Sequence, residues 1–516
     1  MKKNRLAAID IGTNSIRSIV VEADRSGKFR ILDDEKVAVR LGEGLHETGA
    51  LAPAAAQRAI DALARLKKII DGYGVRATEA VATSAVRKAA NGAAFIATIA
   101  RDVGLTVRVI SGEEEAELVA LSAFNNFDLG ETRQLMVDIG GGSLELVTSV
   151  GQHIEEIFSL ELGAVYLTET FLKSDPLTAR EYSTLRRHIR KTLKATFWEG
   201  RPLVPALIGS GGTITAIAAM AMAGRSEAYG SGHGYEVLRS DVVHLLAMLL
   251  RKDLEERRAV PGLNPDRADI IVAGITVIDE LMEFCQTNLL RINERGIREG
   301  IILKGLRKYH LLPAVKKPPS WRDAVLEFAA SCHVDEEHAR HVARLALLIF
   351  ETVARPFKFG EKEARILEAA ALLHDIGYFI NYSAHHKHSY HLIRHADLFG
   401  FTPRERELVA NVARYHRKSL PKKKHEEFMR LSAPDRELVS RLGGILRLAD
   451  GLDRRRTGSV ATLDCLLSPG KLRIRLAGAD DLSVELFGGK IKGDLFQEAF
   501  GLKLMLEAPS TSLPPG

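Results

Sequence analysis

Residues Leu135–Ser149 read LMVDIGGGSLELVTS, and this stretch decides the fold. An apolar strand leads into Asp138, then into Gly140–Gly142 and Ser143, and a second alternating strand covers Leu144–Thr148. Glycines lack the side chains that would keep a polyanion away from the backbone N–H groups. Ser143 can donate one further hydrogen bond. The stretch therefore predicts a strand–loop–strand unit that holds a phosphate.

Two carboxylates stand at the ends of this loop, Asp138 before it and Glu145 after it. Carboxylates in such positions can hold a hard cation such as Mg2+. The pattern is not the dinucleotide fingerprint G-x-G-x-x-G, because an acid precedes the glycines and a strand follows them. Taken alone, the stretch is also compatible with a glycine-rich hairpin turn that binds nothing.

An internal repeat favours the phosphate-binding interpretation. Residues Leu6–Val20 read LAAIDIGTNSIRSIV, and they align with the first stretch so that Asp10, Gly12 and Ser15 match Asp138, Gly140 and Ser143. Two copies of one strand–loop–strand unit predict two similar halves that face each other across a cleft. This arrangement resembles the superfamily of actin, sugar kinases and heat-shock-chaperone ATPases.

Length and composition limit the classes of protein to which the chain can belong. The chain has 516 residues, 46% hydrophobic and 27% charged, which predicts about three or four soluble domains. Three widely spaced cysteines indicate a reducing compartment. The N-terminus meets Asp10 before an apolar segment develops, and the longest apolar stretch, Thr213–Ala223, is shorter than the ~20 residues of a membrane span. We therefore expect a cytoplasmic protein with neither a membrane nor a specific nucleic acid as partner. The net charge of +6 is mild and alone says little about partners.

Two further segments contain candidate phosphate-binding or catalytic residues. Glu79–Asn91 reads EAVATSAVRKAAN, a strand that runs into a helix with Arg87 in its first turns. An arginine there is either a surface residue or one whose planar guanidinium group binds phosphate. Residues 111–116, SGEEEA, begin another helix, and its acids compensate the helix dipole or supply a general base.

In combination, these motifs resemble the exopolyphosphatase/guanosine pentaphosphate phosphatase (Ppx/GppA) family. Six matches follow one another over roughly the first three hundred residues: DIGTNS (10–15), ATSAVRKAAN (82–91), ISGEEEA (110–116), DIGGGSLEL (138–146), GSGGT (209–213) and IREGI (297–301).

The resemblance implies an α/β fold of two actin-like (ribonuclease H-like) lobes with the active site between them. It implies hydrolysis of terminal phosphoanhydride bonds assisted by Mg2+ or Mn2+, and a homodimer. Glu115 matches the acid that activates water, and Glu114 stands beside it. Asp138, Glu145 and Asp10 match metal-associated carboxylates. The phosphate-holding set comprises Asn14, Ser15, Arg87, Gly140, Gly141, Gly142 and Ser143.

The two loops are not equivalent, because Thr13-Asn14 in the first replaces glycines of the second. We expect the second loop to hold the phosphate that is cleaved. Gly211 and Gly212 precede an alanine-rich helix, whose N-terminus is an anion site or only a tight connection.

The second half of the chain differs in character. Leu311–Ser320, LLPAVKKPPS, is predicted to be a linker. Amphipathic helices with His341, the pair His374-Asp375 and Asp450 follow, and their order resembles the HD metal-dependent phosphohydrolase superfamily. His386, His388 and His416 are possible extra ligands. The resemblance implies a second divalent metal and a second hydrolytic centre, although some family members keep this helical fold without ligands and use it to hold polyphosphate.

The predicted domains are residues 1–125 and 126–310 for the two lobes, 321–457 for the all-α HD-like domain and 458–516 for a small α+β domain. Alternating patterns predict strands over Lys471–Leu476 and Leu482–Leu486 in the last domain. Basic runs at 414–418, 422–425 and 454–456 are either solvated surface or a track for a polyanion.

The favoured function is an exopolyphosphatase in which Glu115 orients the attacking water. A guanosine pentaphosphate phosphatase would use the same site, and the motifs do not separate the two substrates. A sugar or acid kinase would share the loops, but the EEEA and ATSAVR segments argue against it. A non-catalytic polyphosphate- or nucleotide-binding regulator would not need the intact carboxylates.

Overall fold

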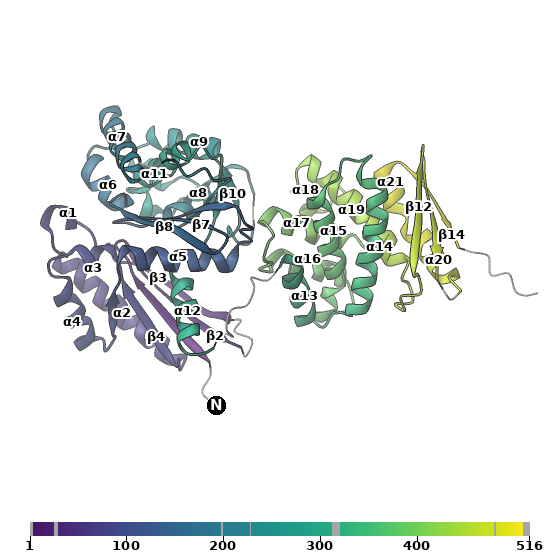
Figure 1. The fold of residues 1–516 in the computed structure, drawn as a ribbon, viewed down its shortest axis with the longest axis horizontal. Coiled ribbons are helices and arrows are strands. Elements are labelled where there is room, and N and C mark those ends of the chain that lie inside the picture. The colour runs from purple at the N-terminus through teal and green to yellow at the C-terminus, as the bar shows by residue number, and fades with distance from the viewer. Residues whose placement is uncertain are drawn as a thin grey trace, which may run out of the picture. The chain divides into compact units, whose positions relative to one another are not determined.

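The computed structural model describes residues 4–24, 29–197, 200–227, 229–311, 320–478 and 481–508. The chain divides into two units, residues 1–318 and 319–516 (Figure 1). Most of the predicted linker, residues 312–319, lies outside the described residues. No helix in the described ranges is both long and apolar enough to cross a membrane.

The first sheet of the first unit has the order β3-β2-β1-β4-β5. β1 (Arg5–Ile11), β2 (Ser15–Ala23) and β3 (Phe29–Ala38) form an antiparallel meander, and β4 (Ala77–Ala82) and β5 (Val107–Val109) continue parallel to β1. Its helices are α1 (Leu45–Thr48), α2 (Pro53–Gly72), α3 (Ser84–Lys88) and α4 (Gly92–Asp102). α2 begins with proline at its first position, where a missing N–H costs nothing, and it buries an alanine- and leucine-rich face.

The second sheet repeats this plan. β6 (Arg133–Ile139), β7 (Leu144–Val150) and β8 (His153–Leu160) form the meander, and β9 (Leu207–Ser210) and β11 (Leu289–Ile292) continue parallel to β6. β10 (Glu236–Leu238) is an added antiparallel edge strand. Two sheets built in the same order confirm the predicted internal repeat. The surrounding helices are α6 (Ala164–Phe171), α7 (Ala179–Thr196), α8 (Gly212–Gly224), α9 (Arg239–Leu250), α10 (Leu254–Arg258), η1 (Pro265–Arg267) and α11 (Ile271–Phe284).

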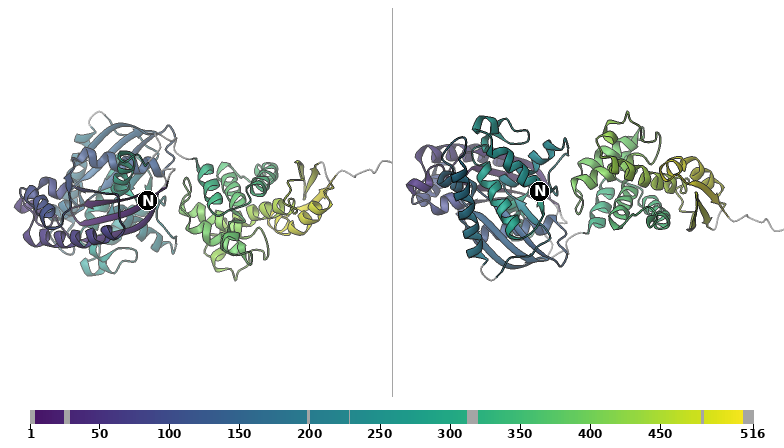
Figure 2. Two further views of the ribbon diagram at one scale, coloured as in Figure 1. Left: turned by 90° about the horizontal axis from the view of Figure 1, so that it is seen from below. Right: turned by 90° about the horizontal axis from the view of Figure 1, so that it is seen from above.

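Two helices connect the sheets. α5 (Gly112–Asn126) packs on β6, β7 and β8, and α12 (Gly296–Lys308) packs on α5 and on β1. Both helices are labelled in Figure 1, and Figure 2 gives two further views of the ribbon. The helices approach closely at Gly300, where an added Cβ would lie 2.0 Å from the carbonyl oxygen of Leu118. α12 therefore returns to the first sheet, although its residues fall within the range predicted for the second lobe.

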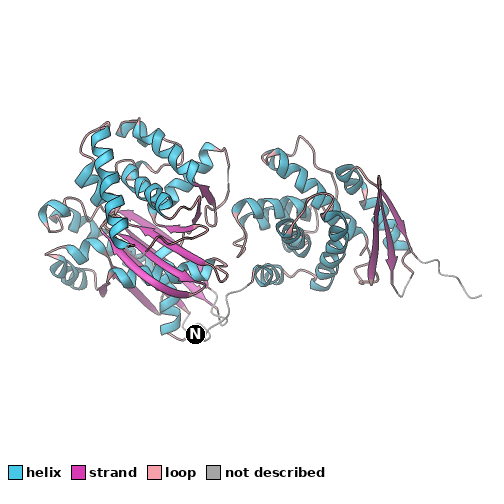
Figure 3. Cartoon of the chain, turned by 45° about the horizontal axis from the view of Figure 1, so that its top comes forward, coloured by secondary structure: helices cyan, strands magenta, loops and turns pink. Residues whose placement is uncertain are grey.

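The second unit is built from helices around one apolar core. They are α13 (Trp321–Ser331), α14 (Glu336–Ala354), α15 (Glu361–Leu373), η2 (Ile376–Phe379), α16 (His385–His395), α17 (Pro403–Arg414), α18 (Glu426–Met429) and α19 (Ala433–Gly451). The same core continues into a three-stranded sheet of β12 (Thr462–Ser468), β13 (Lys471–Ala477) and β14 (Lys503–Glu507), shown in Figure 3, with α20 (Ser483–Lys492) and α21 (Asp494–Phe500).

The strand predicted over Leu482–Leu486 is wrong, because Leu482 is the N-cap of α20 and the helix itself begins at Ser483. The alternation of Leu482, Val484 and Leu486 imitates a strand. The deciding contact lies farther along, where Gly488 meets α19 so closely that an added Cβ would lie 2.2 Å from the Gly451 carbonyl oxygen. Tertiary packing of glycine on glycine therefore overrides the local pattern.

Candidate active site

The two strand–loop–strand units close their loops in the same way. The Gly12 N–H donates to the Ser15 carbonyl at 3.2 Å, and the Gly140 N–H donates to the Ser143 carbonyl at 3.0 Å. The strand register then places one pair of residues beside each loop. Asp10 lies opposite Arg17, and Asp138 lies opposite Glu145.

The second loop presents its N–H groups as an anion cradle. The first turn of α6 binds the loop carbonyls, since Ala164 N donates to Gly140 O at 3.0 Å and Val165 N to Gly141 O at 2.9 Å. Within the described residues, the N–H groups of Gly141, Gly142 and Ser143 donate to no backbone carbonyl. Free N–H groups on successive residues attract phosphate.

The two loops face each other at short range. An added Cβ at Gly141 would lie 2.9 Å from Thr13 Cβ, and one at Gly142 would lie 2.6 Å from Ser84 Oγ. The structure thus brings residues of the first sheet, the α3 turn and the second loop to one place. Asn14, also in the first loop, accepts two backbone hydrogen bonds at its carbonyl, and Ser15 begins β2.

Glu115 lies in the first turn of α5 and is only 7% exposed. Arg87 of α3 donates to Glu115 Oε2 at 3.2 Å and to the Ile110 carbonyl at 2.8 Å. Burial, followed by the nearby Glu145 carboxylate, raises the pKa of Glu115 well above its usual value, while Arg87 opposes this shift. A buried carboxylate held by one arginine beside a phosphate cradle is suited to accept a proton from water.

Glu114, which is predicted to act beside Glu115, lies in a separate ion pair, and its catalytic role stays a prediction. Its carboxylate pairs with Arg108 at 2.8 Å and with Lys304 at 2.7 Å. These contacts, Arg108 first, lower the pKa of Glu114 to about 2. Because adjacent helical residues point about 100° apart, only Glu115 turns toward the cradle.

Three more carboxylates surround Glu115. Burial raises the pKa of Asp10 to about 6 and that of Glu145 to about 8, and the neighbouring Asp138 adds to both shifts. The pKa of Asp138 itself is raised by burial, although Ser210 Oγ donates to Asp138 Oδ1 at 3.1 Å. Asp10 Oδ1 and Glu145 Oε2 are buried and have no hydrogen-bond partner.

These orphaned oxygens fit a divalent cation, which would neutralise the mutual repulsion of the acids. Asp10, Asp138 and Glu145 do not form a group of three ligand atoms within 4.8 Å of one another in the described ranges. The arrangement fits an ion that uses one or two carboxylates and completes its shell with substrate oxygens and water, as Mg2+ does.

Gly211 and Gly212 lie at the same site, beside Asp138 and Arg267. Gly211 has a positive φ of 93°, and its added Cβ would lie 2.7 Å from Asp138 Oδ1. At Gly212 an added Cβ would lie 2.0 Å from a guanidinium nitrogen of Arg267. Both glycines therefore let charged side chains approach the backbone at the start of α8.

Sequence reasoning missed the cations of this site. Arg17 stands opposite Asp10, the buried Arg298 donates to the Ser18 carbonyl at 3.2 Å and pairs with Asp34, and Arg267 rests on Gly212. Burial, followed by repulsion from Arg17, lowers the pKa of Arg267 to about 10. The repeat alignment contained the signal for Arg17, because it places that residue at the position of Glu145. No sequence signal identifies Arg267.

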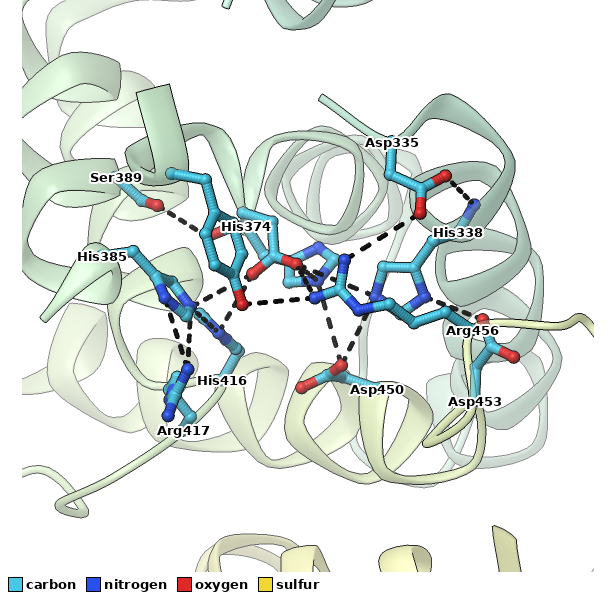
Figure 4. A network of polar contacts seen from close by, with 12 residues as sticks. Asp335, His338, His374, His385, Ser389, His416, Arg417, Asp450, Asp453 and Arg456 are labelled. Carbon is cyan, nitrogen blue, oxygen red and sulfur yellow. Dashed lines mark hydrogen bonds and ion pairs between the residues drawn. The ribbon is translucent and has the colours of Figure 1, made fainter. Parts of the chain in front are cut away.

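The second unit contains another polar cluster (Figure 4). Of the predicted residues, it brings together His374, Asp375, His416 and Asp450. His341 is outside it and accepts from Arg344 at 3.3 Å, so its predicted role is corrected. His386 and His388 also lie outside the cluster, and the residues missed are His338 and His385.

A helical pattern could have found His338. It precedes the buried Val342 by four residues and Leu345 by seven, which places it on the buried face of α14. His385, at the start of α16, has no comparable signal.

Comparisons with known proteins identify the family. The model of the Ppx/GppA phosphatase family matches residues 19–309, and that of Ppx/GppA phosphatase, domain III, matches residues 322–485. A protein named guanosine-5'-triphosphate,3'-diphosphate pyrophosphatase from Vibrio vulnificus (strain YJ016) is 28% identical over 461 residues, covering 88% of each chain.

Comparison with solved structures points to the same family. The Aquifex aeolicus member of the Ppx/GppA family is 32% identical with a TM-score of 0.52, covering 59% of this chain and 98% of that one. An exopolyphosphatase from Cytophaga hutchinsonii ATCC 33406 is 28% identical with a TM-score of 0.56, covering 60% of this chain and 100% of that one. The predicted α/β fold with two actin-like lobes is confirmed. The chain is therefore a hydrolase that belongs to the Ppx/GppA phosphatase family.

Proposed function

We propose that the site between the two loops of the first unit hydrolyses the terminal phosphoanhydride bond of inorganic polyphosphate. The observation that carries this proposal is the position of Glu115, a buried carboxylate held by Arg87 beside the glycine cradle and three further acids. Burial, followed by the Glu145 carboxylate, raises the pKa of Glu115, so these two acids lie within one electrostatic site.

In this proposal, Glu115 accepts a proton from water, and the water oxygen forms a bond to the terminal phosphorus. The bond from that phosphorus to the bridging oxygen breaks, and the shortened chain leaves with the bridging oxygen. The N–H groups of Gly141, Gly142 and Ser143 bind the oxygens of the transferred phosphoryl group. Arg87 keeps the Glu115 carboxylate in one orientation.

A divalent cation, Mg2+ or Mn2+, would supply neutralisation of phosphate charge when bound. Asp10, Asp138 and Glu145 are the residues proposed to hold it, because two of them carry buried oxygens without a hydrogen-bond partner.

The buried cations support a repeating polyanion as substrate. Burial, followed by repulsion from Arg17, lowers the pKa of Arg267. Burial, followed by repulsion from Arg17 and Arg267, also lowers the pKa of Lys36. A bound polyphosphate would relieve the repulsion among these cations. In the basic runs of the second unit, Arg414 pairs with Glu427 and Arg456 pairs with Asp375. A polyanion track along these runs stays a prediction.

Guanosine pentaphosphate is the second candidate substrate, because the Vibrio relatives bear the corresponding name and the bond broken is the same. A non-catalytic regulator is the third candidate, for which the acids of the site would be dispensable. The homodimer implied by the family resemblance stays a prediction, which light scattering of the purified chain would test.

The deciding experiment measures phosphate release in Mg2+ from long-chain polyphosphate, guanosine pentaphosphate and ATP. Glu115→Gln is compared with Glu114→Gln, the neighbouring residue in an exposed ion pair. Release from polyphosphate that disappears only in Glu115→Gln supports the proposal, and preference for guanosine pentaphosphate would transfer it to the second substrate. No release from any compound, or full activity of Glu115→Gln, would overturn the mechanism.

A further inference from the structure

Three large apolar side chains are exposed to solvent where η2 ends. Phe379, Ile380 and Tyr382 are 56%, 51% and 70% exposed, and none of them belongs to the apolar core of the second unit. A single exposed apolar residue is ordinary on a protein surface. Several within residues 379–382, two of them aromatic, mark a surface that binds another molecule.

The backbone holds this segment at both ends. Before it, Gly377 meets the start of α16 so closely that an added Cβ would lie 2.0 Å from the His385 carbonyl oxygen. After it, Ala384 has a φ of 57°, a left-handed conformation that alanine rarely adopts. Such residues persist where the surrounding structure determines them, and they concentrate at ligand-binding positions. The exposed side chains are therefore carried on a fixed segment.

Aromatic rings and guanidinium groups adjoin the segment. The ring centroids of Tyr378 and Tyr382 are 5.6 Å apart, and those of Tyr382 and His385 are 6.2 Å apart. Arg456 lies 5.5 Å from the centroid of the Tyr378 ring. Arg417 Nη1 lies 3.3 Å from His385 Nδ1, and Figure 4 shows the two side chains together. The apolar surface thus adjoins two arginines from distant parts of the chain.

Arg417 also begins an exposed loop rich in cations. Residues 376–388 and 415–425 contain no acidic residue, and their lysines and arginines are Lys387, Arg417, Lys418, Lys422, Lys423 and Lys424. Among the residues that the structure describes, no ion pair joins any of these cations to a carboxylate. Lys418 has a positive φ of 61°, so this loop, like the first segment, contains a strained position. Exposed cations without counter-charges attract a polyanion.

The combination of rings and cations distinguishes among polyanions. Inorganic polyphosphate supplies charge but has no apolar face to cover exposed rings. A mononucleotide supplies one base and leaves most of the lysines without a contact. Single-stranded nucleic acid repeats a base and a phosphate at every unit, and proteins bind it with rings that stack on bases beside a positively charged surface.

Polar groups next to the rings favour RNA over DNA. Asn381 and Ser383 flank Tyr382 in the sequence, and both are exposed. The Ser383 N–H donates to Asn381 Oδ1 at 2.7 Å, which uses neither the Asn381 amide nitrogen nor the Ser383 hydroxyl. A 2′-hydroxyl, which distinguishes RNA from DNA, can accept a hydrogen bond from the amide and donate one to the hydroxyl.

We propose that the aromatic–basic surface, formed by residues 378–383 and the loop 417–424, binds single-stranded RNA without preference for base sequence. Bases stack on the rings of Tyr378, Phe379 and Tyr382, and the lysines of the loop contact phosphates. The binding is non-covalent and uses neither a metal ion nor the site of the first unit.

The test measures binding of a fluorescein-labelled oligo(U) of 20 nucleotides to the full chain by fluorescence anisotropy in EDTA. Tyr382→Ala is expected to weaken binding roughly tenfold, the effect of losing one stacked base, and Tyr382→Phe to retain it. Phe487→Ala is the matched control, because Phe487 is 65% exposed in the same unit but lies in α20. Equal affinities of the two alanine variants, or no binding by the parent, would overturn the proposal.

The salt dependence of binding tests the basic loop. For single strands, the logarithm of affinity falls by about 0.7 per phosphate contact for each tenfold rise in salt. Replacing three loop lysines by methionine should make this slope shallower by about 2. The loop variant carries Lys422→Met, Lys423→Met and Lys424→Met. Its control carries Lys362→Met, Lys471→Met and Lys503→Met, at exposed positions of the same unit, and should keep the parent slope. Equal slopes in the two variants would refute phosphate binding by the loop.

Three other ligands separate the alternatives. Long-chain polyphosphate should bind Tyr382→Ala as tightly as the parent, because it has no bases. Oligo(dT) of equal length should bind the parent several-fold more weakly than oligo(U). Vesicles that contain phosphatidylserine should not bind the protein. Equal affinity for the two oligonucleotides, or vesicle binding that Phe379→Ala abolishes, would overturn RNA as the ligand of this surface.

Discussion

Glu145 lies opposite Asp138 in the β6–β7 register, and the equivalent position of the first repeat, opposite Asp10, holds Arg17. Because one hairpin has Glu145 where the other has Arg17, the two hairpins differ in local charge. The second hairpin concentrates negative charge, which suits a cation, and the first places a cation beside its acid. A substrate phosphate between the hairpins would therefore meet a metal on one side and a guanidinium on the other.

Glu115→Gln is expected to lower kcat at least 100-fold with little change in KM. The amide keeps the shape but cannot accept a proton, and loss of a positioned base costs roughly 10²–10⁴-fold. Steady-state phosphate release with polyphosphate measures both constants.

The matched control is Glu114→Gln, which removes an exposed ion pair with Arg108 and Lys304. Such pairs contribute about 0–1 kcal/mol, so this variant should keep near-normal kcat and stability. Equal losses in the two variants would show that the first turn of α5 as a whole, rather than Glu115, matters.

Glu145→Gln is expected to stabilise the metal-free protein at alkaline pH. Burial raises the pKa of Glu145 to about 8, above its ordinary value of 4.5. A carboxyl group with a raised folded-state pKa contributes stability below the ordinary value, and that contribution is lost as pH rises through the folded-state pKa. At pH 8.5 in EDTA, the variant should be about 1–3 kcal/mol more stable than the parent.

Calorimetry at pH 5.5 and pH 8.5 measures this effect as a change in the unfolding temperature. The difference between variant and parent should be larger at pH 8.5. Parallel behaviour at the two pH values would contradict a raised pKa for Glu145.

Much of the site was predictable because its residues are close in sequence to recognisable strands. Asp10, Asp138 and Glu145 follow from strand ends and one repeat, and the register then fixes their partners. Arg267 is different. It reaches Gly212 from η1, and nothing in the local sequence specifies which distant segment fills the space above a glycine.

The helical unit shows the same limit. The order of histidines and aspartates predicted His374, Asp375 and Asp450, whereas the choice between His338 and His341 depends on which face of α14 is buried. These two residues lie three positions apart, and in the sequence they are separated by the apolar spacing that places His338 on one face with Val342 and Leu345. The packing of α14 on α15 and α19 makes the choice.

Gly163→Ala is expected to reduce activity strongly by distorting the phosphate cradle. An added Cβ would lie 2.4 Å from the Gly141 carbonyl oxygen and 2.4 Å from Ser143 N, both backbone atoms. Overpacking of this kind costs about 1–3 kcal/mol and shifts the surrounding backbone. Phosphate release and the unfolding temperature should both fall.

Gly72→Ala is the control for this substitution. It lies at the end of α2, its added Cβ meets nothing within 4 Å, and alanine favours the helix. Activity should be unchanged. A Gly163→Ala variant with normal KM and kcat would show that the cradle tolerates displacement and does not position the phosphate.

Arg267→Met is expected to separate anion binding from stability. Arg267 is buried, its Nε has no hydrogen-bond partner, and its pKa is lowered to about 10 by burial and by Arg17. Removing a buried, repelled cation should leave the unfolding temperature unchanged or raise it. If the guanidinium binds substrate phosphate, KM should rise about tenfold, since a hydrogen bond to a charged group contributes about 1.5–3 kcal/mol.

Arg258→Met is the matched control, because Arg258 pairs with Glu255 in α10 and is exposed. Its KM should equal that of the parent at every salt concentration, whereas the KM of Arg267→Met should depend less on salt than that of the parent, because one screened attraction is missing. An unchanged KM together with a lower unfolding temperature in Arg267→Met would assign Arg267 to the packing of Gly212 alone. A higher KM with retained stability would place this cation in the path of the polyanion.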